Sequence, residues 1–253
     1  MSQYDFAAQR LYVDEPLTEG AIFALSRDQA NYLLKVLRLA DRSTILVFNG
    51  RDGEWRANIE ITGKRDAAIR AVSLERLQTP RAPLQLLFAP IKHARLDYMV
   101  QKAVEMGVGR LTPVLTRRTQ VHRINLERMR ANVIEAAEQC GVMALTDIDE
   151  PISLDRLIAD WPASKGLIFC DEDAPIEEPV GSLRQWHLAN STSVSVLIGP
   201  EGGFDPLERA LLSKCSECRA ISLGPRILRA DTAAVAALAI VQTALGDWRG
   251  DLA

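Results

Sequence analysis

The sequence predicts an α/β protein in which a small β-barrel domain precedes a larger domain with a mainly parallel sheet. Two observations support this prediction. From residue 84 onward, short apolar runs alternate with amphipathic stretches of helical period, which is typical of parallel strands joined by crossover helices. Before residue 76, most of the apolar runs are short and strand-like, and only one helix interrupts them.

The bulk composition is that of an ordinary globular protein. At 253 residues, the chain is long enough for one large domain or two modest ones, and its hydrophobic fraction of 47% is usual for soluble proteins. No apolar run approaches membrane-spanning length, and the first residues lack the layout of a signal peptide. Four cysteines make no disulfide framework. We therefore expect a cytoplasmic protein without a membrane partner.

Positive charge is concentrated in one part of the chain, although the net charge of the whole protein is −3. Residues 74–130 hold eleven Lys and Arg against four Asp and Glu, whereas residues 131–253 hold nine against nineteen. Affinity for phosphate depends on a local basic face more than on the total charge, so a nucleic-acid partner is compatible with this sequence. A solvated helix face would give the same distribution.

The N-terminal third has four segments of strand composition, with the hairpin-type dipeptides Asn49-Gly50 and Asp52-Gly53 between two of them. One helix, capped by Ser26 or Asp28, carries an apolar stripe from Ala30 to Leu37. The expected strands cover residues 10–13, 45–48, 55–61 and 67–72.

The proline-containing stretch 78–83 is the expected boundary, so that the first domain covers residues 1–75 and the second covers residues 82–253. The strands expected in the second domain cover residues 84–88, 111–115, 166–170, 194–198 and 220–223. The expected helices are one through 96–104 that ends at Gly107, one over 132–141, one opened by Asp205 and Pro206, and one over 232–245.

Two of these strands end in a glycine-proline pair, and the loops that follow them are the most informative part of the sequence. The strand 194–198 leads into Gly199-Pro200-Glu201-Gly202-Gly203-Phe204, and the strand 220–223 leads into residues 224–232. Glycine lets a ligand approach the backbone, and proline stiffens the loop. Two such loops at strand ends are how an open α/β sheet builds a crevice for a small molecule.

Other chemistries are less well supported. A single glycine-proline pair is common in ordinary turns. Neither loop matches a phosphate-binding glycine motif, and Glu201 stands where a phosphate would need a cation, which disfavours a nucleotide-phosphate enzyme. Cys215 and Cys218 have zinc-like spacing, but no second pair completes four ligands, so we expect no metal.

Both loops follow the patterns of a known family. Residues 198–204 read I-G-P-E-G-G-F, and residues 223–233 read L-G-P-R-I-L-R-A-D-T-A. They resemble the hGPEGGh and hLGxRhLRxETA loops of the RsmE-type ribosomal RNA methyltransferases of the SPOUT superfamily, with Ala230 in place of threonine and Asp231 in place of glutamate. The N-terminal third is similar to the PUA-like domain of that family, so the resemblance covers nearly the whole chain.

The resemblance implies a fold and an activity. The fold is a PUA-like β-barrel, which binds RNA, followed by a SPOUT-type α/β trefoil-knot methyltransferase domain. The activity is methylation of N3 of one uridine in 16S ribosomal RNA of the small ribosomal subunit by a homodimer, with S-adenosyl-L-methionine as the cofactor. We keep one alternative from another class, a non-catalytic RNA-binding or ribosome-assembly factor on the same fold.

The resemblance also implies which residues form the site. Those expected to bind the cofactor are Cys170, Ile198, Gly199, Pro200, Glu201, Gly202, Leu223, Gly224, Ile227, Leu228, Thr232 and Ala233. Those expected to contact RNA are Arg10, Arg38, Lys92, Arg117, Arg118 and Arg123. Most are arginines, whose planar fork can bind two phosphate oxygens.

Methyl transfer from a sulfonium needs alignment of the reacting atoms and removal of the N3 proton rather than a covalent intermediate. A flipped uridine suits this reaction, because pairing hides N3 in a folded RNA. Arg229 is expected to stabilise the negative charge that spreads over the uracil oxygens. The proton acceptor is Asp231, Glu201 or solvent, and a carboxylate that does not accept the proton would hold its loop by hydrogen bonds. The sequence does not decide between these alternatives.

Overall fold

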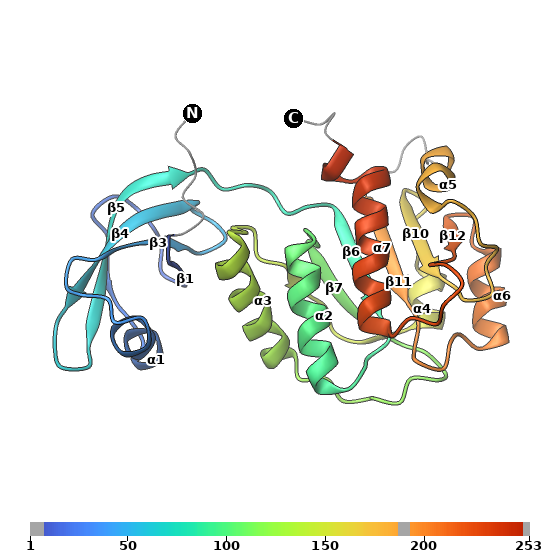
Figure 1. The fold of residues 1–253 in the computed structure, drawn as a ribbon, viewed down its shortest axis with the longest axis horizontal. Helices are drawn as coiled ribbons and strands as arrows, with labels where there is room; N and C mark the ends of the chain where they lie inside the picture. Colours follow the sequence, from blue (N-terminus) through green and yellow to red (C-terminus); the bar gives the residue numbers. More distant parts are fainter. Residues whose placement is uncertain (1–7, 187–192, 250–253) are drawn as a thin grey trace. The chain divides into compact units, whose positions relative to one another are not determined.

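The chain forms two units, each with its own sheet, in a computed structural model that describes residues 8–186 and 193–249 (Figure 1). One unit comprises residues 1–80 together with 137–145, and the other comprises residues 81–136 and 146–253. The N-terminal residues on which the expectation about a signal peptide was based, 1–5, lie outside the described part.

The first unit contains a five-stranded curled sheet in the order β1-β3-β4-β5-β2. Its strands are β1 (Arg10–Tyr12), β2 (Ile22–Ala24), β3 (Thr44–Phe48), β4 (Glu54–Ile61) and β5 (Ala67–Arg76). β1 runs parallel to β3, and the other neighbours are antiparallel. The sequence did not predict β2, an edge strand of three apolar residues in which only Phe23 is partly buried, because three residues are too few to show a period of two.

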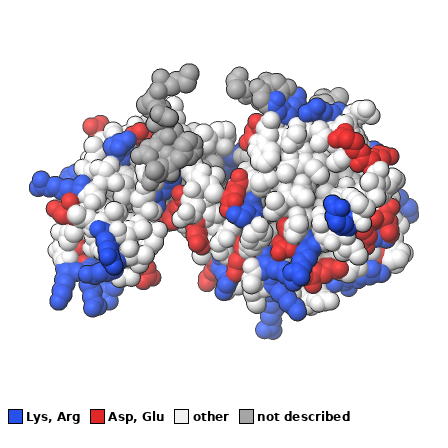
Figure 2. Space-filling model, viewed as in Figure 1, with Lys and Arg blue, Asp and Glu red and all other residues white. Residues whose placement is uncertain are grey.

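The helix expected near Ala30 is divided into a short α-helix, α1 (Arg27–Asn31), and a π-helix, η1 (Tyr32–Val36). Ser26 caps α1, because its Oγ accepts the N–H of Gln29 at 3.2 Å and the Gln29 side chain accepts the N–H of Ser26 at 3.0 Å. The apolar stripe still faces the core, where Leu33 is fully buried. On the face shown in Figure 2, Lys and Arg side chains gather at the lower left, over α1 and the β4–β5 turn.

A buried carboxylate joins three strands of this sheet. The carboxylate of Glu54 on β4 accepts hydrogen bonds from Nε of Arg10 at 3.2 Å and from Nε of Arg76 at 2.8 Å. Arg76 also donates a hydrogen bond to the carbonyl of Gly141 at 2.9 Å. Arg10 is only 3% exposed. The prediction that Arg10 contacts RNA is therefore wrong, because its guanidinium is buried in an ion pair with Glu54.

The second unit contains a seven-stranded sheet with the strand order β12-β10-β11-β6-β7-β8, and β9 pairs with β7. Every strand pair in it is parallel, as predicted. The strands are β6 (Leu84–Phe88), β7 (Arg110–Leu115), β8 (Asp147–Ile148), β9 (Ile152–Ser153), β10 (Lys165–Cys170), β11 (Ser193–Ile198) and β12 (Cys218–Ile221).

Helices cover both faces of this sheet (Figure 1). They are α2 (His93–Glu105), α3 (Leu126–Cys140), α4 (Leu154–Ala159), α5 (Pro179–Gln185), α6 (Pro206–Lys214) and α7 (Ala230–Leu245), with a short 3₁₀ turn at Asp247–Arg249. α7 packs against α2, α5 and β11, whereas α4 packs against α6. No helix among the described residues has the length and hydropathy needed to span a membrane.

The order of the last three strands creates a crevice. The chain passes from β10 through α5 to the neighbouring β11, and then through α6 to β12 on the opposite side of β10. In open parallel sheets such a change of direction opens a crevice outside the carboxyl ends of the strands. The ends of β10, β11 and β12 therefore bring three loops together.

Polar side chains fix the strand register at the other end of the sheet. Gln85 on β6 donates from Nε2 to Oγ1 of Thr112 on β7 at 2.6 Å and accepts Oγ of Ser195 on β11 at 3.1 Å. Lys165 on β10 donates to the same amide oxygen of Gln85, and burial lowers the pKa of Lys165. These bonds tie four strands to one another.

We expect Glu54→Ala to lower the free energy of unfolding of the first unit by about 3–5 kcal/mol, because it leaves Arg10 and Arg76 without their shared carboxylate. Urea unfolding followed by hydrogen exchange of the β3–β5 amides measures this. The control is Glu75→Ala, which removes the partner of the exposed Arg56 and should cost less than about 1 kcal/mol. Equal losses in the two variants would contradict the role of Glu54.

Candidate active site

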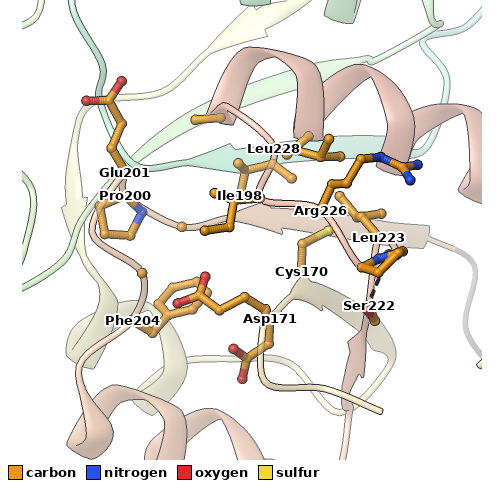
Figure 3. A pocket seen from close by; sticks show the side chains of 18 of the residues that line it. Cys170, Asp171, Ile198, Pro200, Glu201, Phe204, Ser222, Leu223, Arg226 and Leu228 are labelled. Carbon is orange, nitrogen blue, oxygen red and sulfur yellow. Dashed lines mark hydrogen bonds between the residues drawn. The ribbon is translucent and has the colours of Figure 1, made fainter. Parts of the chain in front are cut away.

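A cavity of about 340 Å³ lies at the carboxyl ends of β10, β11 and β12 (Figure 3). Its lining comes from three segments that the crevice brings together. These are residues 170–172 after β10, residues 198–201, 203 and 204 after β11, and residues 222–228, 230 and 233 around the start of α7, together with Ile176. The volume falls within the range of sites for small ligands, roughly 300–1,000 Å³.

The loop after β11 folds tightly back on the protein. Phe204 is 2% exposed and packs edge-to-face on Phe169, with 6.2 Å between ring centroids. A Cβ at Gly199 would lie 2.9 Å from the Phe204 ring. Gly203 has φ +67°, and a Cβ there would lie 2.3 Å from Oε1 of Glu172. Both positions therefore need glycine, one for close packing and the other for backbone conformation as well.

Two arginines hold the outer side of this loop. Nη1 of Arg95 on α2 donates to Oε1 of Glu201 at 2.6 Å, and Nη1 of Arg118 donates to the carbonyl of Gly202 at 2.7 Å. The buried Glu208 of α6 accepts the backbone N–H of Arg117 at 2.7 Å and that of Asp205 at 2.9 Å. The basic segment at Arg117 and Arg118 is thus fixed to the cavity wall.

The wall that follows β10 is acidic. Asp171 and Glu172 line the cavity. Nη2 of Arg209 on α6 lies 3.0 Å from Oδ1 of Asp171 and 3.0 Å from Oε1 of Glu172, and Arg209 also binds Asp173. One guanidinium therefore holds the whole acidic turn against α6, with the first two carboxylates at the cavity.

The loop after β12 forms the remaining wall. Leu223 and Leu228 supply apolar surface to the cavity, as does Ile198 at the end of β11 (Figure 3). Arg226 is the cation of this loop that lines the cavity. The side chain of Ile227, at its edge, is 97% exposed.

The cavity gathers most of the residues expected to bind a cofactor. The lining includes Cys170, Ile198, Gly199, Pro200, Glu201, Leu223, Gly224, Ile227, Leu228 and Ala233. Gly202 and Thr232 are outside the lining: Gly202 turns toward Arg118, and Thr232 is exposed on the first turn of α7. Lining residues that were not expected include Asp171, Glu172, Gly203, Phe204, Ser222 and Arg226. The acidic pair could have been found, because it directly follows a strand expected to border the crevice.

The residues expected to act on the substrate occupy different positions. Glu201 lines the cavity. Arg229 is the exposed N-cap residue of α7, so this helix begins two residues earlier than expected. Asp231 accepts the N–H of Thr232 at 3.0 Å on the first turn of α7. Arg229 and Asp231 both lie outside the lining, next to lining residues of the second loop.

The remaining residues expected to contact RNA are exposed. Lys92 precedes α2, Arg123 precedes α3, and Arg38 follows η1. Nη1 of Arg117 lies 3.9 Å from Asp205. Arg118 is exposed as well but already donates to the Gly202 carbonyl.

The thiol at the cavity is not activated. Loss of hydration and the neighbouring Asp171 carboxylate raise the pKa of Cys170 to about 12. Burial likewise raises the pKa of Cys218. Within residues 8–186 and 193–249, no group of three His, Cys, Asp or Glu side chains is arranged to hold a metal ion.

Both units of the chain match known protein families. A model of the RNA methyltransferase domain family matches residues 78–242, and a model of the RNA methyltransferase PUA domain matches residues 25–72. Ribosomal RNA small subunit methyltransferase E of Rickettsia conorii is 32% identical over 236 residues, which cover 92% of this chain and 94% of that relative.

Two solved structures are similar along nearly their whole length. Ribosomal RNA small subunit methyltransferase E of Neisseria gonorrhoeae, bound to S-adenosyl methionine, is 25% identical with a TM-score of 0.80, and the match covers 93% of this chain and 97% of that one. A protein of Legionella pneumophila in complex with the same cofactor is 31% identical with a TM-score of 0.75, and the match covers 94% and 98%.

These matches define the class together with the parallel sheet and the crevice at the ends of β10, β11 and β12. The class is a SPOUT-type α/β knot methyltransferase domain preceded by a PUA-like domain. The predicted fold class is therefore confirmed, with a curled half-barrel as the first sheet. The chain belongs to the family of ribosomal RNA small subunit methyltransferase E.

We expect iodoacetamide at pH 8 to label the exposed Cys140 at least about 10-fold faster than Cys170, because the thiolate is the reactive form and a pKa of about 12 leaves little of it. Labelling of Cys170 should accelerate as the pH is raised to 10. Peptide mass spectrometry over a time course measures both rates. Similar rates at pH 8 would contradict the raised pKa.

Proposed function

We propose that this protein transfers a methyl group from S-adenosyl-L-methionine to small-subunit ribosomal RNA, at N3 of one uridine. The observation that carries the proposal is the cavity built from the two glycine-proline loops at the strand ends. The relative of Rickettsia conorii, whose name is that of a ribosomal RNA methyltransferase, matches 92% of the chain, which includes both units. The two family models likewise match one unit each.

The cavity fits such a cofactor in size and chemistry. Ile198, Leu223 and Leu228 offer apolar surface for a flat heterocycle, and Asp171 and Glu172 offer acceptors for hydroxyl or ammonium groups. At Gly203 a Cβ would displace one of these acceptors, so the absence of a side chain keeps that wall in place. When bound, the cofactor supplies a methyl group on a sulfonium that is already a good leaving group.

The residues of this chain then have to orient the uridine and take its N3 proton. Of the two carboxylates considered, Glu201 lines the cavity and is oriented by Arg95, which favours it over Asp231 as the proton acceptor. Arg229 extends from the loop that borders the cavity and would stabilise the charge that develops on the uracil oxygens. The exposed cations Lys92, Arg117, Arg118 and Arg123 would hold the surrounding phosphates.

We further propose that the protein is a homodimer and acts in the cytoplasm, where its ribosomal substrate is made. Tyr98 on α2 is 45% exposed and Trp248, in the turn after α7, is 53% exposed. Because α2 packs against α7, these elements would offer apolar surface to a second copy. Sedimentation of the purified protein measures the oligomeric state.

A methylation assay on small ribosomal subunits and on their free RNA, with the product mapped by mass spectrometry, tests the function. The proposal predicts one methylated uridine that depends on the cofactor. Binding of RNA without transfer of a methyl group would instead support the non-catalytic assembly factor.

We expect Gly203→Ala to weaken binding of S-adenosyl-L-methionine about 10-fold or more. Alanine at φ +67° strains the loop, and its Cβ pushes Glu172 from the wall. Titration calorimetry measures the affinity, and circular dichroism checks the fold. The matched control is Gly202→Ala, whose Cβ would meet only Arg118 at 3.7 Å and should leave the affinity near wild type. Weaker cofactor binding in both variants, or in neither, would contradict the assignment of Gly203 and Glu172 to the cofactor-binding wall.

We expect Arg229→Ala to lower the single-turnover methylation rate about 10²-fold, comparable to the loss of an oxyanion donor, with much smaller changes in RNA and cofactor affinity. Arg229→Lys should recover only part of the rate, since a point charge replaces a planar fork. Lys214→Ala, an exposed cation on α6, serves as the charge-matched control. A normal rate at saturation with weaker RNA binding would reduce Arg229 to a phosphate contact.

A further inference from the structure

One arginine of α6 binds the whole acidic turn that borders the cavity after β10. Nη2 of Arg209 lies 3.0 Å from Oδ1 of Asp171 and 3.0 Å from Oε1 of Glu172, and Nη1 binds Asp173. Asp171 and Glu172 line the cavity, and Figure 3 shows Asp171 beside Cys170 at the end of β10. Arg209 lies outside that lining, so any effect it has on a ligand passes through these carboxylates.

The acidic turn brings three carboxylates close together. The N–H of Asp171 donates to the carbonyl of Ile221 on β12 at 3.1 Å, and the N–H of Asp173 donates to Oδ1 of Asp171 at 3.2 Å. Like charges at such short range repel one another. Because Arg209 binds all three carboxylates, its guanidinium offsets this repulsion.

The carboxylate of Glu172 lies directly against the loop after β11. A Cβ at Gly203 would lie 2.3 Å from Oε1 of Glu172, which is the oxygen that Arg209 binds. The side chain of Glu172 is 61% exposed, so burial alone does not fix it. Its place beside Gly203 therefore depends on the bond to Arg209.

Arg209 extends from a helix that is itself anchored. Asp205 caps α6, the side chain of Glu208 accepts the N–H of Asp205 at 2.9 Å, and Leu212 is fully buried in the core. Within the described part of the chain, Nε of Arg209 is buried and binds no acceptor, whereas both Nη atoms bind carboxylates. A buried donor without an acceptor costs free energy, so the guanidinium is placed for the acidic turn at the expense of its own hydrogen bonding.

We propose that Arg209 is a positioning residue of the cofactor site. It holds the carboxylates of Asp171 and Glu172 where they accept hydrogen bonds from the hydroxyl or ammonium groups of S-adenosyl-L-methionine. The inference rests on the proposed function, because it takes that cofactor as the ligand of the cavity. A wall that is ordered before the ligand arrives lowers the cost of binding, so Arg209 acts on cofactor affinity and not on the transfer step.

The test is titration calorimetry of the full-length protein with S-adenosyl-L-methionine, together with single-turnover methylation of small-subunit RNA at saturating cofactor. For Arg209→Ala we expect the Kd to rise about 10-fold or more, because the charge-assisted bonds that hold the wall are lost. The saturated rate and the RNA affinity should stay within about 2-fold of wild type. Arg209→Lys should recover only part of the cofactor affinity, since an ammonium group lacks the planar fork.

A second background separates positioning from a general structural effect. In a protein that already carries Asp171→Asn and Glu172→Gln, adding Arg209→Ala should raise the Kd by less than about 3-fold, because the carboxylates through which Arg209 acts are gone. Losses of affinity that multiply in full would show that Arg209 acts by another route and would overturn the proposal.

The control is Arg110→Ala, which removes a guanidinium bound to Asp147 and Asp149 at the start of β7 and should leave the Kd near wild type. Wild-type cofactor affinity in Arg209→Ala would overturn the proposal, and so would an unchanged Kd with slower transfer. If circular dichroism shows that Arg209→Ala does not fold, Arg209→Lys takes its place. Equal cofactor affinities of Arg209→Lys and the wild type would then overturn the proposal.

Failure of the positioning role and failure of the proposed function give different results. If the wild-type protein binds the cofactor without transferring a methyl group, and Arg209→Ala weakens that binding, the function fails and the positioning role stands. If methylation occurs and Arg209→Ala binds the cofactor like wild type, the positioning role fails and the function stands. A wild-type protein that does not bind the cofactor would overturn both.

Discussion

The candidate site depends on one close contact inside the loop after β11. Phe204 is buried against Phe169, and its ring lies so near Gly199 that a single methyl group there would overlap it. Burial of a phenylalanine side chain contributes about 1.5–3 kcal/mol, which offsets part of the entropy lost when the loop is ordered. Because the loop enters the core at Phe204, Pro200 and Glu201 have to project on the cavity side. The packing of Phe204 against Phe169 therefore determines where Pro200 and Glu201 lie in the cavity wall.

The rest of the wall is held by charges and by strand register. Arg95, Arg118 and Arg209 each join a helix or loop to a different part of the wall. At the opposite end of the sheet, Gln85 bonds to both neighbouring strands, and a slip of one residue would turn every side chain of a strand to the other face. The three loops consequently meet in one arrangement before any ligand arrives, which reduces the ordering cost of binding.

Periodicity and turn chemistry predicted the elements that are long or strongly capped, such as β6, α2 and the helix opened by Asp205. Short edge strands and the division of the first helix were not visible, since α- and π-helical turns bury the same leucines. Arg10 was predicted to contact RNA because the first domain resembles an RNA-binding domain. The sequence did not reveal its partner Glu54, which is 44 residues away. Of two adjacent glycines, only backbone geometry distinguishes Gly203, on the cavity wall, from Gly202.

The division of the chain has a consequence for its synthesis. The first unit includes residues 137–145, and Arg76 bonds to a carbonyl within that segment. All three cavity loops come from beyond residue 169, and α7, which packs on β11, is the last long helix in the sequence. Such long sequence separations between contacts slow folding, because loops must close before the contacts form. On a translating ribosome, the first unit is therefore complete only when residues 137–145 have emerged, and the protein acquires its binding site only when nearly all of it has been made.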